Sequence, residues 1–214
     1  MLIRRTFALT SLGFLLLSAL AIGTARAETA EKGHETAIFS GGCFWCVESD
    51  FDNVPGVVRT ISGYTGGITP NPTYKQVSTD KTGHLEAVEI IYDPKKVSYE
   101  TLVDILFHSV DPTDDGGQFC DRGESYKTAI FATSPAQEQI AVEVKQKLQD
   151  AGVLKKPIVT KIEEAGPFFP AETYHQDYYE KNPVRYKLYR YRCGRDGRVE
   201  ALWGKEAHRG IAKH

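Results

Sequence analysis

The stretch TAIFSGGCFWCVE, residues 36–48, opens the fold and carries the most reactive side chains of this 214-residue chain. Residues 36–39 form an apolar run that predicts a strand, and Gly41 and Gly42 allow a tight turn that can approach a ligand closely. The residues after the glycines are compatible with a helix that begins at about Cys43 and ends near Phe51. We therefore expect a strand, a turn and a short helix with a cysteine at its start.

Cys43 is the predicted nucleophile. The N-terminus of a helix concentrates unpaired N–H groups and the positive end of the helix dipole, which favour thiolate over thiol. A free thiol titrates near about 8.5, and we expect this position to lower the pKa. Cys46 follows three residues later on the same helical face, so its sulfur lies within reach. The spacing thus predicts a nucleophile and a resolving thiol in one turn.

The same cysteine pair has two other interpretations. A Cys-x-x-Cys pair can be half of a zinc site, and buried cysteines are often only small core residues. Cys120 and Cys193 are isolated, and neither belongs to a second such pair or stands near closely spaced histidines. The pattern therefore favours redox chemistry at Cys43 and Cys46, with no metal and no other cofactor.

Residues 1–27 have the pattern of a signal peptide. Arg4 and Arg5 precede an almost wholly apolar run at 7–22, and the letters A-R-A at 25–27 supply a small-x-small cleavage site. The apolar run is short for a membrane span, so we expect export to the periplasm without stable membrane insertion after cleavage. Because paired arginines also fit a twin-arginine signal, the sequence leaves the export route open.

The mature chain, residues 28–214, has a length that suits one catalytic domain with a hydrophobic core. Without the three arginines of the signal peptide, the 26 basic residues fall to 23 against 28 acidic residues, which gives a net charge of −5. This charge argues against a nucleic-acid partner. We interpret the basic and aromatic run at 185–198 as a solvated face or as a segment that covers the core.

Hydrophobic periodicity predicts strands and helices in alternation. Ser98 caps a helix with an apolar stripe, while Ser134, Pro135 and Gly152 mark the ends of another helix. The expected strands are 36–39, 57–64, 85–92, 126–132 and 158–163, and the expected helices are 43–51, 98–110 and 134–152. This order predicts the α+β class, a ferredoxin-like αβ plait in two layers with a C-terminal extension that includes the aromatic segment at 168–191.

Glu86 is the best candidate for an acid. Strand periodicity places it on one face with Val88 and Ile90, beside apolar surface that would raise its pKa and keep the carboxyl protonated. The same pattern is compatible with an ordinary surface carboxylate. The sequence leaves these two interpretations of Glu86 open.

Four aromatic residues stand near the candidate groups. Tyr74 and Tyr126 each adjoin a glycine-rich loop, and a phenolic O–H there can stabilise a developing oxyanion. Phe44 and Trp45 adjoin the nucleophile and would form a compact apolar pocket for a small alkyl group. Each of the four is also compatible with ordinary packing in the core.

Six short motifs cover nearly all of the mature chain. They are GGCFW at 41–45, SGYTGG at 62–67, NPTY at 71–74, TGHLEAV at 82–88, DRGESY at 121–126 and YHQ at 174–176. Together, and in this order, they resemble the peptide methionine sulfoxide reductases of the A type. The resemblance implies an αβ plait that reduces the S epimer of methionine sulfoxide, either free or in proteins.

The resemblance also implies roles for individual residues. Cys43 matches the nucleophile that attacks the sulfoxide sulfur, and Glu86 matches the acid that protonates the sulfoxide oxygen. Tyr74 and Tyr126 match groups that assist this acid, and Asp121 matches an aspartate of the same polar site.

The remaining matches concern the substrate and the reductant. Phe44 and Trp45 match the pocket for the terminal methyl group. Release of methionine would leave Cys43 as a sulfenic acid, which a second cysteine converts to a disulfide. A thioredoxin-like protein would then reduce that disulfide, and export implies such a partner in the periplasm.

The identity of the second cysteine is where this chain departs from many members of the family. Many have glycine at the position of Cys46 and use cysteines near the C-terminus, whereas others have the Cys-Phe-Trp-Cys form. This chain has both Cys46 and Cys193. We favour Cys46, because a pair in one helical turn needs no long loop closure. Cys193 could pass the disulfide outward or take no part in the reaction, and Cys120 has no role assigned by the sequence.

Two other functions compete with methionine sulfoxide reduction. A strand, a turn and a Cys-x-x-Cys helix also begin general thiol-disulfide oxidoreductases of the thioredoxin kind. The glycine pair before Cys43 and the lack of a clear strand with a cis-proline candidate argue against that class. The third interpretation is a binding module in which an aromatic pocket captures methionine side chains and a Cys43–Cys46 bridge is only structural.

Overall fold

The computed structural model describes residues 33–212. The predicted signal peptide at 1–27 lies outside this range. The described residues form a mixed α+β structure around one mostly open sheet. Across residues 33–212, no helix combines the length and the apolar character that a membrane span requires.

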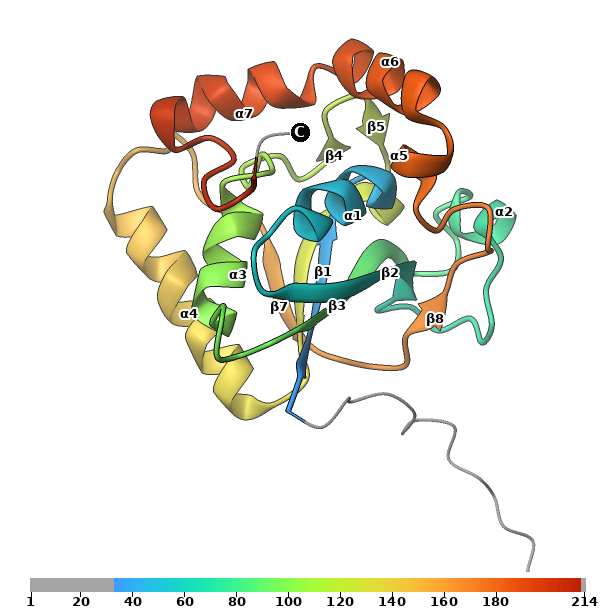
Figure 1. The fold of residues 1–214 in the computed structure, drawn as a ribbon, viewed down its shortest axis with the longest axis horizontal. Coiled ribbons are helices and arrows are strands. Elements are labelled where there is room, and N and C mark those ends of the chain that lie inside the picture. Colours follow the sequence, from blue (N-terminus) through green and yellow to red (C-terminus); the bar gives the residue numbers. More distant parts are fainter. Residues whose placement is uncertain (1–32, 213–214) are drawn as a thin grey trace, which may run out of the picture.

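A six-stranded sheet forms the centre of the structure (Figure 1). The strands lie in the order β7-β6-β1-β3-β2-β8, and neighbours are antiparallel except for the parallel pair β6 and β7. They are β1 (Glu35–Gly41), β2 (Val57–Thr65), β3 (Leu85–Tyr92), β6 (Thr128–Ala132), β7 (Lys161–Glu164) and β8 (Phe169–Pro170). Because β1 lies between β3 and β6, it carries the chain from the middle of the sheet into the cysteine turn.

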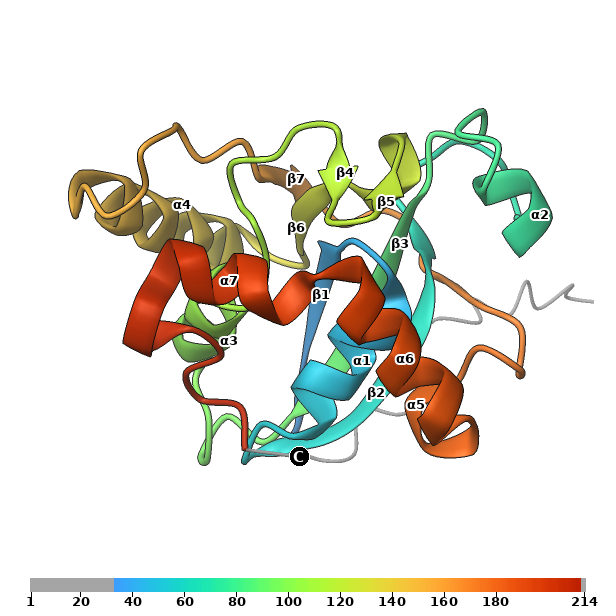
Figure 2. The same cartoon turned by 90° about the horizontal axis from the view of Figure 1, so that it is seen from above.

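The remaining elements surround this sheet. Two short strands, β4 (Gly117–Gln118) and β5 (Asp121–Arg122), pair with each other outside it. The helices are α1 (Phe44–Asp52), α2 (Tyr74–Val77), α3 (Tyr99–Phe107), α4 (Pro135–Asp150), α5 (Tyr178–Lys181), α6 (Pro183–Cys193) and α7 (Arg195–Trp203), with 3-10 turns η1 (Glu124–Tyr126) and η2 (Gly204–Glu206). Both views show α5 and α6 beside α1 (Figures 1 and 2).

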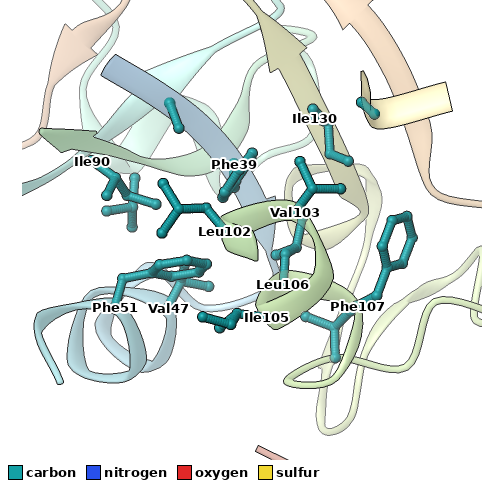
Figure 3. Packing of buried hydrophobic residues seen from close by; sticks show 14 of the residues in the cluster. Phe39, Val47, Phe51, Ile90, Leu102, Val103, Ile105, Leu106, Phe107 and Ile130 are labelled. Atoms are coloured by element: carbon teal, nitrogen blue, oxygen red, sulfur yellow. The ribbon is translucent and has the colours of Figure 1, made fainter. Parts of the chain in front are cut away.

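The main hydrophobic core lies between one face of the sheet and the helices α1, α3 and α4. Figure 3 shows Phe39 and Ile90 of the sheet facing Phe51 of α1 and Leu102 and Leu106 of α3. The rings of Phe39 and Phe51 have centroids 5.5 Å apart. Residues that alternate with these along the strands point to the other face, where a smaller cluster forms. Its buried members are Ile38, Ala87, Ala129 and Phe131.

The capping residues predicted from the sequence are confirmed. The Ser98 hydroxyl accepts a hydrogen bond from the Thr101 N–H, and the Ser134 hydroxyl accepts one from the Gln137 N–H. Pro135 occupies the first turn of α4 as expected. Helix α3 ends at 107 rather than 110, and the last predicted strand, 158–163, is shifted to 161–164. The predicted strand at 126–132 begins at 128, after the turn η1.

The C-terminal third contains regular structure that the sequence analysis did not assign. The aromatic segment at 168–191 forms β8, α5 and most of α6. Helix α6 has weak amphipathic patterning, because only Tyr186 among its residues is buried. An ion pair attaches the helix instead: Nη1 of Arg190 donates to Oδ1 of Asp50 on α1 at 2.7 Å. Of the two interpretations of residues 185–198, most of these side chains are exposed as in a solvated face, while Tyr186 and Arg195 are buried.

Leu106→Ala tests the packing of α3 on the sheet. Because Leu106 is fully buried, we expect the substitution to lower the free energy of unfolding by about 2–5 kcal/mol, measured by urea denaturation. The control is Val142→Ala on the exposed side of α4, which should change it by less than about 0.5 kcal/mol. Similar losses in both variants would contradict the described core.

Candidate active site

The turn before α1 requires both glycines. Gly42 has φ +84°, in the left-handed region, and a Cβ built on it would stand 2.5 Å from the Cβ of Gln118. A Cβ on Gly41 would stand 2.9 Å from a methyl carbon of Val47. Because neither glycine has a side chain, the turn after β1 can pass close to Gln118 and Val47. Cys43 then lies at the N-cap of α1, as the sequence predicts.

Glu86 belongs to β3, and its side chain lies next to the first residue of α1. Its Oε2 accepts a hydrogen bond of 2.9 Å from the Phe44 N–H, and the residue is only 3% exposed. Burial raises the pKa of Glu86 to about 8; the Phe44 N–H opposes this shift, and the charges of Asp121 and Cys46 add to it. The carboxyl group therefore holds its proton at neutral pH. Of the two interpretations of Glu86, the structure shows the buried one.

The pKa values of the two free thiols are shifted in opposite directions. Burial raises the pKa of Cys43 well above its ordinary value, and its hydrogen bond to Cys46 and the nearby Glu86 and Asp121 raise it further. The same hydrogen bond lowers the pKa of Cys46, and the charge of Arg195 also lowers it. The expectation that the helix N-terminus lowers the pKa of Cys43 is thus wrong for the resting site. Burial outweighs the helix dipole at Cys43, and the interaction with Cys46 and the charges of Glu86 and Asp121 add to it.

The polar residues predicted for the site lie together. Tyr74 begins α2 and Tyr126 ends η1, and the two side chains lie close enough to affect each other's pKa. Burial raises the pKa of both tyrosines, and the neighbouring charge of Glu86 raises it further. Asp121 of β5 acts electrostatically on Glu86 and accepts a short hydrogen bond from the Tyr189 hydroxyl. The structure therefore brings these predicted side chains to one end of the sheet.

Aromatic rings enclose the start of α1. Nε1 of Trp45 donates to Nδ1 of His175 at 3.0 Å, and the Trp45 ring stacks on Tyr178 with centroids 3.7 Å apart. The rings of Phe44 and His175 have centroids 4.9 Å apart. Burial lowers the pKa of His175, which favours the neutral ring that can accept a hydrogen bond from the indole N–H of Trp45. This bond fixes the orientation of Trp45 next to the thiols.

Several residues of the site were missed by the sequence analysis. Glu172 accepts hydrogen bonds of 2.9 Å from the Tyr64 hydroxyl and the Tyr74 N–H, and thus connects β2 to α2. His175 belongs to a motif that supported the family resemblance, but that motif did not indicate a role. Arg195 stands in a run that the sequence analysis interpreted only as surface or covering chain. Nothing in the spacing of these residues signals that they converge.

A disulfide joins Cys120 and Cys193, whose Cα atoms are 4.9 Å apart. It connects the loop before β5 to the end of α6 and adjoins a surface hollow of about 430 Å³ that Arg198 also lines. Cys120, Cys193 and Asp121 place possible metal-ligand atoms within 4.8 Å of one another, but both sulfurs are used by the disulfide. Cys43 and Cys46 remain free thiols. The structure thus gives Cys120 a partner that the sequence analysis did not assign.

This arrangement suits thiol-dependent reduction. A buried thiol pair can lose two electrons by forming a disulfide, and the protonated carboxyl of Glu86 can supply a proton beside it. The geometry therefore defines the class as a thiol-based reductase.

Comparison with known proteins identifies the family. The family described as peptide methionine sulfoxide reductase matches residues 35–207. A peptide methionine sulfoxide reductase MsrA of Bacillus licheniformis is 53% identical over 177 residues, which are 83% of this chain and 97% of that protein. MsrA 2 of Rhizobium meliloti is 50% identical over 201 residues, covering 94% of this chain and 96% of its own length.

A solved structure agrees with this match. Methionine sulfoxide reductase A of Corynebacterium diphtheriae has a TM-score of 0.65 and 38% sequence identity, and the likeness covers 72% of this chain and 78% of that one. The chain belongs to the peptide methionine sulfoxide reductase family, whose enzymes reduce methionine sulfoxide.

The raised pKa of Glu86 predicts a pH-dependent stability. Folding moves this pKa from about 4.5 to about 8, so the folded state binds more protons between these values. Glu86 therefore lowers the free energy of unfolding by an amount that is absent below pH 4.5, grows up to about pH 8 and is constant above it. Glu86→Gln cannot ionise and keeps an acceptor for the Phe44 N–H, so its unfolding free energy should exceed that of the parent increasingly from pH 5 to pH 8. A constant difference across urea denaturation curves in this range would contradict the raised pKa.

Proposed function

We propose that this chain reduces the S epimer of methionine sulfoxide, in proteins or as the free amino acid, with Cys43 as nucleophile and Glu86 as acid. The observation that carries this proposal is the position of Glu86, which is protonated and hydrogen-bonded to the residue next to Cys43. An acid in this state can donate a proton to the sulfoxide oxygen at the moment the sulfur is attacked.

The first chemical step transfers oxygen from the substrate to the enzyme. The Cys43 sulfur attacks the sulfoxide sulfur, and a transient bond forms between the two sulfurs. The oxygen then moves from the substrate sulfur to the Cys43 sulfur as the bond between the sulfurs breaks, which gives methionine and a Cys43 sulfenic acid. Glu86 protonates the oxygen, while the hydroxyls of Tyr74 and Tyr126 stabilise the charge that develops there. Asp121 contributes to the same polar region, where its charge helps keep the proton on Glu86.

The aromatic enclosure supplies the place for the methyl group. Phe44 and Trp45 present apolar surface beside the nucleophile, and His175 and Tyr178 hold the Trp45 ring in one orientation. A rigid apolar pocket of this kind accepts a terminal methyl and disfavours a charged group. Selection between sulfoxide epimers follows when the methyl and the oxygen each have one fixed place.

The second step forms a disulfide and water. Cys46 attacks the sulfenic sulfur of Cys43, the sulfenic oxygen leaves as water, and the two sulfurs are joined. Cys46 is favoured for this role because it is a free thiol one helical turn from Cys43, whereas Cys193 is joined to Cys120. A thioredoxin-like dithiol protein then reduces the new disulfide and restores both thiols.

General thiol-disulfide exchange is the less favoured function. The family match indicates sulfoxide reduction instead. A protonated acid such as Glu86 is also not needed for simple exchange, in which a thiolate attacks a disulfide and a thiolate leaves. A binding module is disfavoured for a similar reason, since the Cys43 and Cys46 thiols are free and do not form a structural bridge.

We also propose the ferredoxin-like plait as the fold. The chain order β1-α1-β2-β3-α3-β6 together with the spatial order β6-β1-β3-β2 supports it. Under this classification, β7, β8 and the helices α5 to α7 are additions to the plait.

Export to the periplasm completes the proposal. Its support is the composition of residues 1–27, with two arginines, an apolar run and a cleavage pattern. An exported reductase would repair oxidised proteins outside the cytoplasm. Its reductant would then be a thioredoxin-like protein of the same compartment.

Substitutions in the redox groups separate the two chemical steps. We expect Cys43→Ser to release no methionine, and Glu86→Gln to slow release by about 100-fold or more, because general acid catalysis is lost. Cys46→Ser should release one methionine per enzyme and then fail to turn over with thioredoxin. The measurement is single-turnover release from separated S and R epimers, followed by mass mapping of disulfides.

The possible outcomes are distinct. Release from the S epimer with a new Cys43–Cys46 bridge supports both steps. Release with a bridge from Cys43 to Cys193 or Cys120 keeps the reaction and overturns the role of Cys46. If neither epimer yields methionine, the proposed reaction is wrong.

Cleavage of the signal peptide can be measured directly. When the full chain is expressed in a Gram-negative host, mature protein in the periplasmic fraction should begin at Glu28 by mass spectrometry. Ala27→Leu removes the small residue at the cleavage site and should leave the leader attached. Accumulation of the uncleaved parent chain in the cytoplasm would contradict the export proposal.

A further inference from the structure

Glu48 is a buried carboxyl group that the proposed reaction does not use. It lies on α1 one helical turn after Trp45, and the residue is 0% exposed. Burial raises the pKa of this carboxyl group to about 7, and the Asp177 N–H opposes the shift. A carboxyl group without contact to water costs free energy, and an apolar side chain could fill the same place in the core. Its presence therefore indicates a polar contact that an apolar side chain could not make.

Glu48 makes such a contact with a backbone segment far from α1 in sequence. Its Oε2 accepts a hydrogen bond of 3.1 Å from the Asp177 N–H. Asp177 directly precedes α5 and has φ +52°, in the left-handed region that residues other than glycine rarely adopt. A backbone conformation of this kind persists only where contacts hold it. The Glu48 carboxyl group thus fixes the turn from which α5 begins.

The residues on both sides of this turn hold the indole ring of Trp45. Before the turn, Nδ1 of His175 accepts a hydrogen bond from Nε1 of Trp45 at 3.0 Å. After it, the ring of Tyr178 stacks on Trp45, with centroids 3.7 Å apart and planes inclined by 7°. Because Trp45 and Glu48 are three residues apart on α1, they lie on the same face of this helix. One helical turn therefore sets where the two neighbouring rings stand relative to the indole.

Two other contacts hold the same segment. The side-chain amide of Gln176 donates to the Ser62 carbonyl at 2.8 Å and accepts from the Ser62 N–H at 2.9 Å, which attaches the segment to β2. The Tyr179 hydroxyl donates to Oδ2 of Asp52 on α1 at 3.0 Å, at the end of a long side chain. Of these three contacts, only the hydrogen bond to Glu48 joins the backbone of the segment to α1.

We propose that Glu48 is a positioning residue that sets the size of the pocket for the substrate methyl group. It acts through Trp45: the hydrogen bond to Asp177 keeps the neighbouring rings in place, and these rings keep the indole in one orientation. The inference rests on the proposed function, in which Trp45 forms one wall of that pocket. A pocket with a fixed wall admits a methyl group and disfavours a larger alkyl group, because close packing tolerates little extra volume.

Discrimination between two alkyl groups tests this role. The substrates are the S epimers of methionine sulfoxide and of ethionine sulfoxide, which has an ethyl group in place of the methyl. In single-turnover release, the reduced parent protein should prefer methionine sulfoxide by about 10-fold or more, because one methylene group in an apolar pocket is worth a factor of this size. Glu48→Met fills a similar volume but offers the Asp177 N–H no strong acceptor. It should lose most of the preference and raise the half-saturating concentration of methionine sulfoxide.

Glu48→Gln is the conservative variant. Its amide oxygen can accept a hydrogen bond from the Asp177 N–H as the carboxyl oxygen does, so it should keep the preference and the half-saturating concentration of the parent protein. The matched control is Glu143→Met on α4. It removes an exposed glutamate that pairs with Gln139 and should leave both values unchanged.

The mobility of the indole ring gives a measurement that does not depend on activity. The chain has two tryptophans, so Trp203→Phe leaves Trp45 as the source of tryptophan fluorescence. In this background, Glu48→Met should raise the rate constant for quenching by acrylamide, whereas Glu48→Gln should not. Tyr178→Leu removes the stacked ring itself and should change the quenching and the preference in the same direction. Because both residues act on one ring, the double variant should be no worse than the more affected single variant.

These measurements separate a positioning role from a structural one. If Glu48→Met lowers only the free energy of unfolding and leaves the quenching and the preference at the parent values, the inference is wrong. Equal changes in Glu48→Met and Glu48→Gln would also overturn it, since the hydrogen bond to Asp177 would then not be responsible. A parent protein that reduces both sulfoxides equally well would show that the pocket does not select the methyl group. If Glu48→Met does not fold, Glu48→Ala and Tyr178→Leu decide, because the inference requires both to lose the preference.

Failure of the proposed function can be distinguished from failure of this inference. Absence of methionine release from the parent protein would overturn the proposed function. The acrylamide measurement would still show whether Glu48 holds the Trp45 ring.

Discussion

The hydrogen bond from the Phe44 N–H to the Glu86 carboxyl is the interaction on which the site depends. It joins the first residue of α1 to β3, and it can form because β1 and β3 are neighbours and the glycine turn is short. The carboxyl group is therefore fixed beside Cys43 by the backbone of a helix and a strand rather than by a mobile loop. A reacting group held in this way keeps its geometry through the catalytic cycle.

Burial determines the protonation states in this site. Burial raises the pKa of Glu86 and of Cys43, because it removes the water that would solvate their ionised forms. The same low-dielectric surroundings strengthen the effect of nearby charges. Carboxyl groups on one side of the thiol pair add to the raised pKa of Cys43, and guanidinium groups on the other side lower the pKa of Cys46.

The C-terminal helices complete the site although they are far from the cysteine turn in sequence. Helix α6 is attached to α1 by the Arg190–Asp50 ion pair and to the β5 loop by the Cys120–Cys193 disulfide. These links hold Tyr189 against Asp121. The enclosure of the thiols therefore depends on charge pairs and one covalent bond as much as on apolar packing.

The local parts of this structure follow from the amino-acid sequence alone. The glycine turn, the cysteine at the start of a helix and the serine caps at 98 and 134 depend on neighbouring residues, and each could be predicted from spacing and conformational preference. Strand periodicity indicated Glu86 and the glycine-rich loops indicated the tyrosines, each with an ordinary packing or surface alternative, and the family motifs then assigned their roles. The αβ order of the chain was predictable for the same reason, since hydrophobic periodicity is a local property.

Which charged groups come together depends on the tertiary structure. Arg195 lies 149 positions after Cys46 in the numbering, and His175 is 130 positions after Trp45, so no spacing rule connects them. The pKa of each thiol depends on burial and on charges from α1, β3, β5, α6 and α7 together, which is why the helix N-terminus alone gave the wrong direction for Cys43. The sequence supplied the reactive groups and their local geometry, whereas folding set their protonation, because electrostatic energies depend on distances in space and on the exclusion of water.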